Sequence, residues 1–142
     1  EPYIHYNYDS ISQFIRKMDT IYTESELEKL IATNYRLAWY DAFRFPISDF
    51  VKIYFAQEGY KDGLHGLVLA ILQAIYSFVV FAKLWEKQNF PDVAISSTMV
   101  SGELHRIGHE VSYWNLTSQM KEIQNPLQRL WIRFKRRYGT KA

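Results

Sequence analysis

The uncharged stretch GLVLAILQAIYSFVVFA, residues 66–82, decides the fold of this 142-residue chain. Charged residues border the stretch on both sides, among them Asp62 and Lys83. A run of this length and composition predicts one long apolar helix, with Asp62 placed to cap its N-terminus and with Gly63 and Gly66 shaping the turn that leads into it. A complete membrane span needs about 20 apolar residues, so the length argues against a full crossing.

Two interpretations of this apolar helix stay open. In the first, the helix is the buried partner of a helical hairpin inside a bundle. In the second, it lies in a membrane interface or dips into it. The sequence does not separate the two, because both environments suit a helix that is apolar on most sides.

The N-terminal half of the chain carries helical periodicity and several helix-capping signals. We expect a helix that follows a cap at Asp9 or Ser10. A second begins at the capping box Thr23–Glu26, in which the Thr hydroxyl and the Glu side chain each accept a backbone N–H. Pro46 is expected to end a helix over residues 36–45 and to open the next one, because the residue before a proline is pushed out of the α region.

The C-terminal half continues the helical pattern. The small polar run over residues 96–98 indicates a loop, and a helix is predicted over residues 102–114. Asn125 followed by Pro126 is typical of an N-cap and a first-turn proline, and starts the last helix. We therefore predict an all-α fold, an irregular helical bundle with a long apolar helix and a C-terminal basic amphipathic helix.

The last helix combines an apolar side with a dense basic charge. Residues 126–142 hold six Lys or Arg and no Asp or Glu. A basic amphipathic helix with aromatic residues on its apolar side is typical of binding to an anionic membrane surface. Core packing with a solvated basic side, or a calmodulin-like or RNA partner, stay as alternatives. The predicted membrane-surface residues are Arg129, Trp131, Arg133, Phe134, Lys135, Arg136 and Arg137.

The composition excludes several classes of function. The chain has no cysteine, which excludes disulfides, thiolate metal sites and a cysteine nucleophile. Its net charge of +2, and the lack of a glycine-rich phosphate loop or an RNP-like run, argue against a nucleic-acid partner. No nucleophile elbow or kinase motif occurs, so we assign no catalytic residue within the chain.

Two short motifs carry a weaker signal. His105 and His109 stand four residues apart on a predicted helix, so both could reach one metal ion, but we favour the interpretation that they are two surface histidines. Asn115-Leu116-Thr117 matches a glycosylation acceptor, which we interpret as a chance match.

Two ordered groups of motifs resemble the C-terminal portion of bacterial family 2 glycosyltransferases, especially those of the lipopolysaccharide-core type. The resemblance covers residues 3–88, and residues 89–142 match no family that we recognise. The first group is Ile4–Ile11, Arg16–Met18 and Tyr22-Thr23. The second group is Phe50–Tyr54, Gly59–Leu67 and Tyr76–Glu86.

The resemblance implies an upstream nucleotide-sugar-binding domain, and since the chain begins at Glu1-Pro2 rather than Met, we expect it to be part of a longer protein. In enzymes of this kind a divalent metal, Mg²⁺ or Mn²⁺, neutralises the departing nucleoside diphosphate, and a carboxylate base deprotonates the acceptor. The chain has no Asp-x-Asp motif, so we expect it to be inactive alone and to bind no cofactor. The resemblance places His5 near the metal or the diphosphate, and Lys17 and Tyr22 near phosphate or acceptor, with helix packing as the simpler role of all three.

We therefore expect residues 1–90 to be the membrane-associating, acceptor-side region of a family 2 glycosyltransferase, and residues 91–142 to be an additional helical tail. The full enzyme would transfer sugar from a nucleotide sugar to a lipid-linked or glycan acceptor in surface-polysaccharide or lipopolysaccharide synthesis. Its expected place is the cytoplasmic face of the bacterial inner membrane, as a peripheral protein. The alternative is a non-enzymatic helical module that binds a membrane surface or a partner protein.

Overall fold

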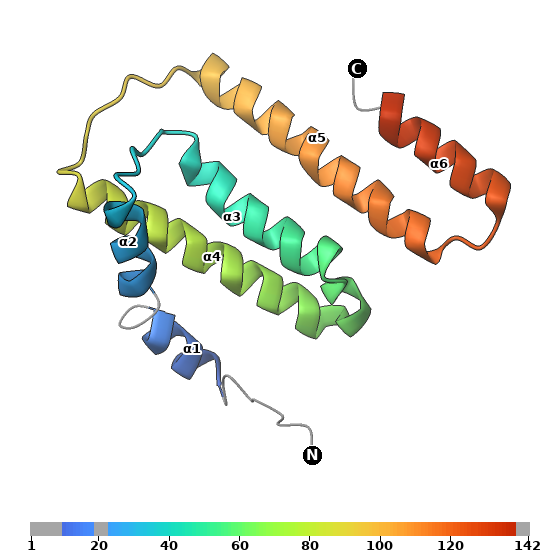
Figure 1. Cartoon of the computed structure of the whole chain (residues 1–142), viewed down its shortest axis with the longest axis horizontal. Coiled ribbons are helices and arrows are strands. Elements are labelled where there is room, and N and C mark those ends of the chain that lie inside the picture. The colour runs from blue at the N-terminus through green and yellow to red at the C-terminus, as the bar shows by residue number, and fades with distance from the viewer. Residues whose placement is uncertain (1–9, 19–22, 139–142) are drawn as a thin grey trace.

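The computed structural model describes residues 10–18 and 23–138, which form α-helices and contain no strand (Figure 1). The predicted all-α fold is confirmed for this part of the chain. Between the third and fourth helices the backbone passes through one π-helical turn, Lys52–Ala56, and one 3-10 turn, Gly59–Asp62. The helices are α1 (Ile11–Lys17), α2 (Thr23–Ala32), α3 (Asp41–Val51), α4 (Gly63–Lys87), α5 (Ser97–Glu122) and α6 (Pro126–Tyr138).

The larger helices lie side by side in a single layer. Figure 1 shows the order α2, α4, α3, α5, α6 across this layer, and each neighbouring pair is in contact. A layer of helices normally buries its apolar side against a second layer. Within the described residues no second layer of helices covers this layer. The solvent-accessible surface of the chain is 10406 Å², whereas that of a compact monomer of 16.9 kDa is about 7,700 Å². Apolar side chains on the faces of the layer therefore stay uncovered.

The antiparallel hairpin of α3 and α4 is the centre of the fold (Figure 1). Its turn depends on the close approach of two glycines. A side chain at Gly66 would overlap the carbonyl oxygen of Gly59, and one at Gly59 would lie 2.9 Å from the carbonyl oxygen of Ile53. The structural role predicted for Gly66 is confirmed. Asp62 takes the N-cap position of α4, but its side chain makes no capping hydrogen bond, so the predicted cap is wrong in its chemistry.

α4 is longer than the uncharged stretch that predicted it. The helix has 25 residues and spans about 38 Å, because it also includes Gly63–His65 before the stretch and Lys83–Lys87 after it. A basic residue in the last turn suits the negative end of the helix dipole, so the charges do not stop the helix. In the described part of the chain this is the one helix long and apolar enough to cross a membrane, a test that core helices also pass. The length argument against a crossing is therefore wrong.

Pro46 lies inside α3 and does not separate two helices, which corrects the expectation from sequence. A proline in a helix interior removes one backbone hydrogen bond and costs about 3 kcal/mol. The packing of α3 against α4 offsets this cost. The chain before α3 is a loop: the Asp41 carboxylate accepts hydrogen bonds from the backbone N–H of Ala38 at 2.8 Å and from the hydroxyl of Tyr35 at 3.0 Å.

α5 begins where a loop was expected. The Ser96 hydroxyl accepts a hydrogen bond from the backbone N–H of Met99 at 3.2 Å, so the serine run caps a helix that extends from Ser97 to Glu122 instead of 102–114. Glu103 fixes this helix to α3, because its carboxylate accepts two hydrogen bonds from Arg44 and a third from Arg106 on the same helix.

The other caps agree with the sequence in two of three cases. Ser10 caps α1 by accepting from the backbone N–H of Gln13 at 3.1 Å, and the Asn125 side chain accepts from the N–H of Leu127 at 2.9 Å. At the start of α2 the capping box is wrong. The Thr23 hydroxyl donates to the carbonyl oxygen of Met18 instead, and Glu26 pairs with Lys29.

Candidate functional site

α6 presents its apolar residues to solvent. Leu127, Leu130, Trp131 and Phe134 follow helical spacing along one side, and each is between 62% and 76% exposed. We call these four residues the α6 stripe. A helix that packed in the core would bury such residues, so the core-packing alternative is wrong for α6.

The opposite side of α6 is fixed to α5. Ile132 is buried, with 8% of its surface exposed. Arg129 donates to the carbonyl oxygen of Met120 at 3.2 Å, and Arg136 donates to the Thr117 hydroxyl at 3.2 Å. The docked side thus orients the helix so that the α6 stripe faces away from α5.

Cations border the α6 stripe. Arg133 and Lys135 are exposed, and the ammonium of Lys135 lies 5.4 Å from the centre of the Trp131 ring. Arg137 is exposed as well, in the last turn of the helix. No acidic residue occurs in α6, so the helix joins an apolar side to a basic rim, which is the arrangement of an interfacial helix.

The predicted membrane-surface set therefore divides in two. Five of its members are placed on the exposed side or rim, and two serve mainly to attach α6 to α5. The first group is Trp131, Arg133, Phe134, Lys135 and Arg137, and the second is Arg129 and Arg136.

A second apolar surface lies on α4. Gly66, Ala70, Val80 and Leu84 are buried against neighbouring helices, so part of the buried-core interpretation is right. Another side of the helix is open, and only 22% of its most apolar window is buried. We call this side the α4 face, which consists of Leu64, Ile71, Ile75 and Phe78, all at least 44% exposed. Pro46, Ile47 and Phe50 of α3 extend it as an apolar groove.

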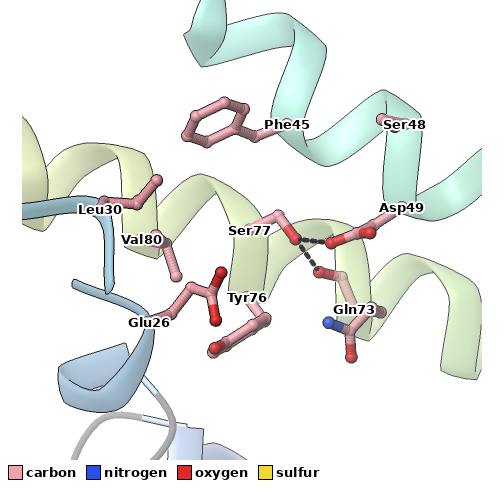
Figure 2. Close-up of a pocket in the computed structure, with 9 residues that line it drawn as sticks. All are labelled: Glu26, Leu30, Phe45, Ser48, Asp49, Gln73, Tyr76, Ser77 and Val80. Carbon is pink, nitrogen blue, oxygen red and sulfur yellow. Dashed lines mark hydrogen bonds between the residues drawn. The ribbon is translucent and has the colours of Figure 1, made fainter. Parts of the chain in front are cut away.

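A polar pocket of 380 Å³ opens between α2, α3 and α4 (Figure 2). The Ser77 hydroxyl donates to the Asp49 carboxylate and lies 3.0 Å from the carbonyl oxygen of Gln73. Tyr76 lines the pocket, and burial together with the negative charges of Glu26 and Asp49 raises the pKa of its phenol. The phenol therefore stays protonated at neutral pH.

This pocket offers acceptors and hydroxyls rather than a metal site. Its lining holds the two carboxylates of Glu26 and Asp49 and no basic side chain. Among the described residues no group of three or more His, Asp or Glu side chains could hold a metal ion. The pocket can thus accept hydrogen bonds from a neutral hydroxyl-bearing or a cationic ligand.

Sequence reasoning did not identify the polar pocket, although one signal pointed to it. Gln73, Tyr76 and Ser77 interrupt the apolar stretch at helical spacing, so they share one side of α4. Their partners Glu26 and Asp49 come from other helices, and only the folded arrangement shows that they meet there.

Of the three residues that the resemblance assigns to a metal, phosphate or acceptor, the structure describes one. His5 and Tyr22 lie outside the described residues, and Lys17 is half-buried in the last turn of α1. His105 and His109 do face each other, with 2.9 Å between their Nε2 atoms. They remain a pair on the surface of α5, because no third ligand stands beside them in the described structure.

Comparison with protein-family models, curated proteins and solved structures found no match to this chain. The resemblance of residues 3–88 to family 2 glycosyltransferases therefore gains no support from these comparisons.

Proposed function

We propose that this chain holds a protein on the surface of an anionic membrane, with the α6 stripe as its main contact. The carrying observation is that α6 is docked on α5 by one side while its four large apolar residues stay exposed on the other. Burying a large apolar side chain contributes about 2 kcal/mol, and each nearby Lys or Arg adds about 1 kcal/mol at an anionic surface. The α4 face supplies a second apolar contact.

On this proposal the anchored protein is a nucleotide-sugar-dependent glycosyltransferase of family 2 that builds a surface polysaccharide or lipopolysaccharide. Support comes from the ordered motifs over residues 3–88. The chain would position the upstream catalytic domain at the inner membrane, where a lipid-linked or glycan acceptor arrives. The upstream domain would supply the divalent metal and the base, and the polar pocket would hydrogen-bond hydroxyls of the acceptor.

A non-enzymatic membrane module is the second candidate function. The same two apolar surfaces favour it, because neither of them requires a catalytic partner. The two proposals share the membrane contact and differ in whether an upstream catalytic domain exists in the native protein.

Vesicle flotation tests the shared part. We expect the chain to float with vesicles that contain phosphatidylglycerol and to be released by high salt, because salt screens exposed charges. Leu130→Ser combined with Trp131→Ser should abolish flotation, and Arg133→Glu combined with Lys135→Glu should reduce it strongly.

Arg36→Glu combined with Lys52→Glu is the matched control, because it changes net charge equally at exposed positions outside α6. This variant should float like the original chain. If the chain stays in the soluble fraction at low salt, or if the α6 variants float as well as the control, the proposed membrane contact is wrong.

A further inference from the structure

An apolar cavity of 410 Å³ lies at the end of the α3–α4 hairpin, where the link from α4 to α5 crosses it. We call this link, residues 88–96, the strap. Trp39 precedes α3, Phe43 lies on α3, and Phe81 and Trp85 lie on α4. Val93 and Ile95 of the strap also line the cavity, so it lies between the hairpin and the strap.

Specific contacts hold the strap in place over the cavity. The Trp85 indole N–H donates to the carbonyl oxygen of Pro91 at 3.1 Å, and the Trp85 ring packs edge-on against Phe90 with centroids 4.9 Å apart. Gln88 donates to the carbonyl oxygen of Tyr35 at 2.9 Å. Asn89 and Phe90 both have positive φ angles, 61° and 49°, and Phe rarely adopts this conformation. The turn is thus fixed by its contacts in a shape that leaves the cavity open.

The cavity lining suits a ligand that needs no hydrogen bonds. Asp92 is its one charged residue, and the Trp85 N–H is already bonded to the strap. Water is held poorly in such a space, because a buried water needs two to four polar partners. A hydrocarbon ligand gains the most binding free energy there, since it leaves water and gives up no hydrogen bond.

The volume of the cavity limits which apolar ligand can enter it. One turn of an α-helix occupies on the order of 400–600 Å³ with its side chains, so a partner helix of two or more turns does not fit inside 410 Å³. A single flexible chain does fit, and the volume lies in the usual range for small-ligand sites.

The cavity also borders the α4 face. Phe81 stacks on Phe78, with ring centroids 6.1 Å apart and planes at 22° to each other. Phe78 belongs to the α4 face, and Phe81 lines the cavity. These two stacked rings thus lead from the α4 face to the edge of the cavity.

We propose that this cavity binds one hydrocarbon chain of a lipid, either an acyl chain or an isoprenoid chain. The inference extends the proposed function and relies on it for the source of the lipid, because the α4 face connects the cavity to the bilayer. On this proposal the protein holds one lipid tail while its α6 stripe rests on the membrane surface.

Binding is tested on the full chain without vesicles, using fluorescent cis-parinaric acid displaced by dodecanoate or by farnesol. We expect saturable binding of one molecule per chain. Tighter competition by dodecanoate assigns an acyl chain, and tighter competition by farnesol assigns an isoprenoid chain. Ala42→Phe places a ring in the cavity wall and should weaken binding at least about tenfold. Ala32→Phe adds the same ring at an exposed position and should leave binding unchanged.

A second measurement covers the case in which Ala42→Phe fails to fold. In a background with Trp114→Phe and Trp131→Phe, the remaining tryptophans are Trp39 and Trp85 of the cavity. Brominated dodecanoate should quench their fluorescence to a saturating limit. Absence of saturable quenching together with absence of displacement by farnesol, or equal affinity in the two variants Ala42→Phe and Ala32→Phe, overturns the cavity proposal. Vesicle flotation tests the membrane contact of α6, whereas these two assays contain no vesicles. A failure of the proposed membrane function can therefore be distinguished from a failure of the cavity proposal.

Discussion

Arg44 and Glu103 form a two-point bridge between α3 and α5. The Arg44 Nε atom lies 2.7 Å from one carboxylate oxygen of Glu103, and a terminal guanidinium nitrogen lies 3.0 Å from the other. The Arg44 guanidinium also covers the Tyr40 ring at 3.6 Å, which holds the arginine in position. Only 7% of the Glu103 side chain is exposed, so this bridge is a principal contact between α5 and the hairpin.

Acid should weaken the attachment of α5. Hydrogen bonds from Arg44 and then Arg106 lower the pKa of Glu103 from 4.5 to about 2. A carboxylate whose pKa is lower in the folded state stabilises that state above the unfolded pKa, so its contribution is complete above about pH 4.5 and is lost as the pH falls toward 2. Urea unfolding of the original chain and of Glu103→Gln should differ by about 2 kcal/mol at pH 7 and converge near pH 2.

Glu110→Gln removes an exposed carboxylate on the same helix and serves as the control, with little effect at either pH. A difference between the original chain and Glu103→Gln that persists at pH 2 would show that the bridge is not the source of the stability.

The turn of the hairpin should not tolerate a side chain at position 66. A Cβ atom there overlaps the Gly59 carbonyl oxygen, so Gly66→Ala should lower the free energy of unfolding by about 3 kcal/mol. Gly102→Ala is the matched control, because nothing lies within 4 Å of its added Cβ atom in α5. The control should stabilise the chain by about 0.5–1 kcal/mol through helix propensity, and thermal melts compare the two. Equal melting temperatures would contradict the turn geometry.

Local signals in the sequence predicted the helices, and tertiary contacts set their limits. The Ser10 and Asn125 caps were predictable because each cap acts within three residues of itself. The predicted helix boundary at Pro46 was wrong because the cost of an interior proline is visible in the local sequence, whereas the packing against α4 that offsets this cost comes from residues far along the chain.

The candidate sites likewise combine features that the local sequence predicts with features that depend on tertiary contacts. The composition of α6 could be predicted from the sequence, but the side of α6 that docks on α5 could not, because Arg129 and Arg136 bond to partners nine and 19 residues away in the sequence. The polar pocket and the apolar cavity each combine residues from several parts of the chain, so a local pattern such as the spacing of Gln73, Tyr76 and Ser77 indicates at most one wall of such a site.

Different residues of α6 should control its stability and its membrane binding. Ile132→Ala removes the buried contact with α5, so amide hydrogen exchange in α6 should become faster. Leu130→Ser alters an exposed position and should leave exchange unchanged while it weakens flotation. If Leu130→Ser accelerates exchange as much as Ile132→Ala does, the α6 stripe is part of a packed interface and not of a membrane surface.

On the glycosyltransferase proposal, changes in the polar pocket should affect the binding of the acceptor rather than the binding of the nucleotide-sugar donor. If the chain belongs to a glycosyltransferase, Asp49→Asn in that longer protein removes one negative charge beside Ser77 and should raise the KM for a glycan acceptor several-fold, with the KM for the nucleotide sugar unchanged. Glu110→Gln, which removes an exposed carboxylate on α5 outside the polar pocket and the apolar cavity, is the control. Equal changes in both KM values would remove the pocket from the acceptor site.

The native gene product should be much heavier than 16.9 kDa if the chain belongs to a glycosyltransferase, because a catalytic domain adds on the order of 200 residues. An immunoblot of fractionated source cells measures this mass, with the heavy band expected in the membrane fraction. In that longer protein, His5→Ala should lower sugar transfer if His5 reaches the metal, and unchanged turnover would remove His5 from the site. A native band near 16.9 kDa would contradict the transferase proposal and favour the non-enzymatic membrane module, since the chain alone carries no Asp-x-Asp motif.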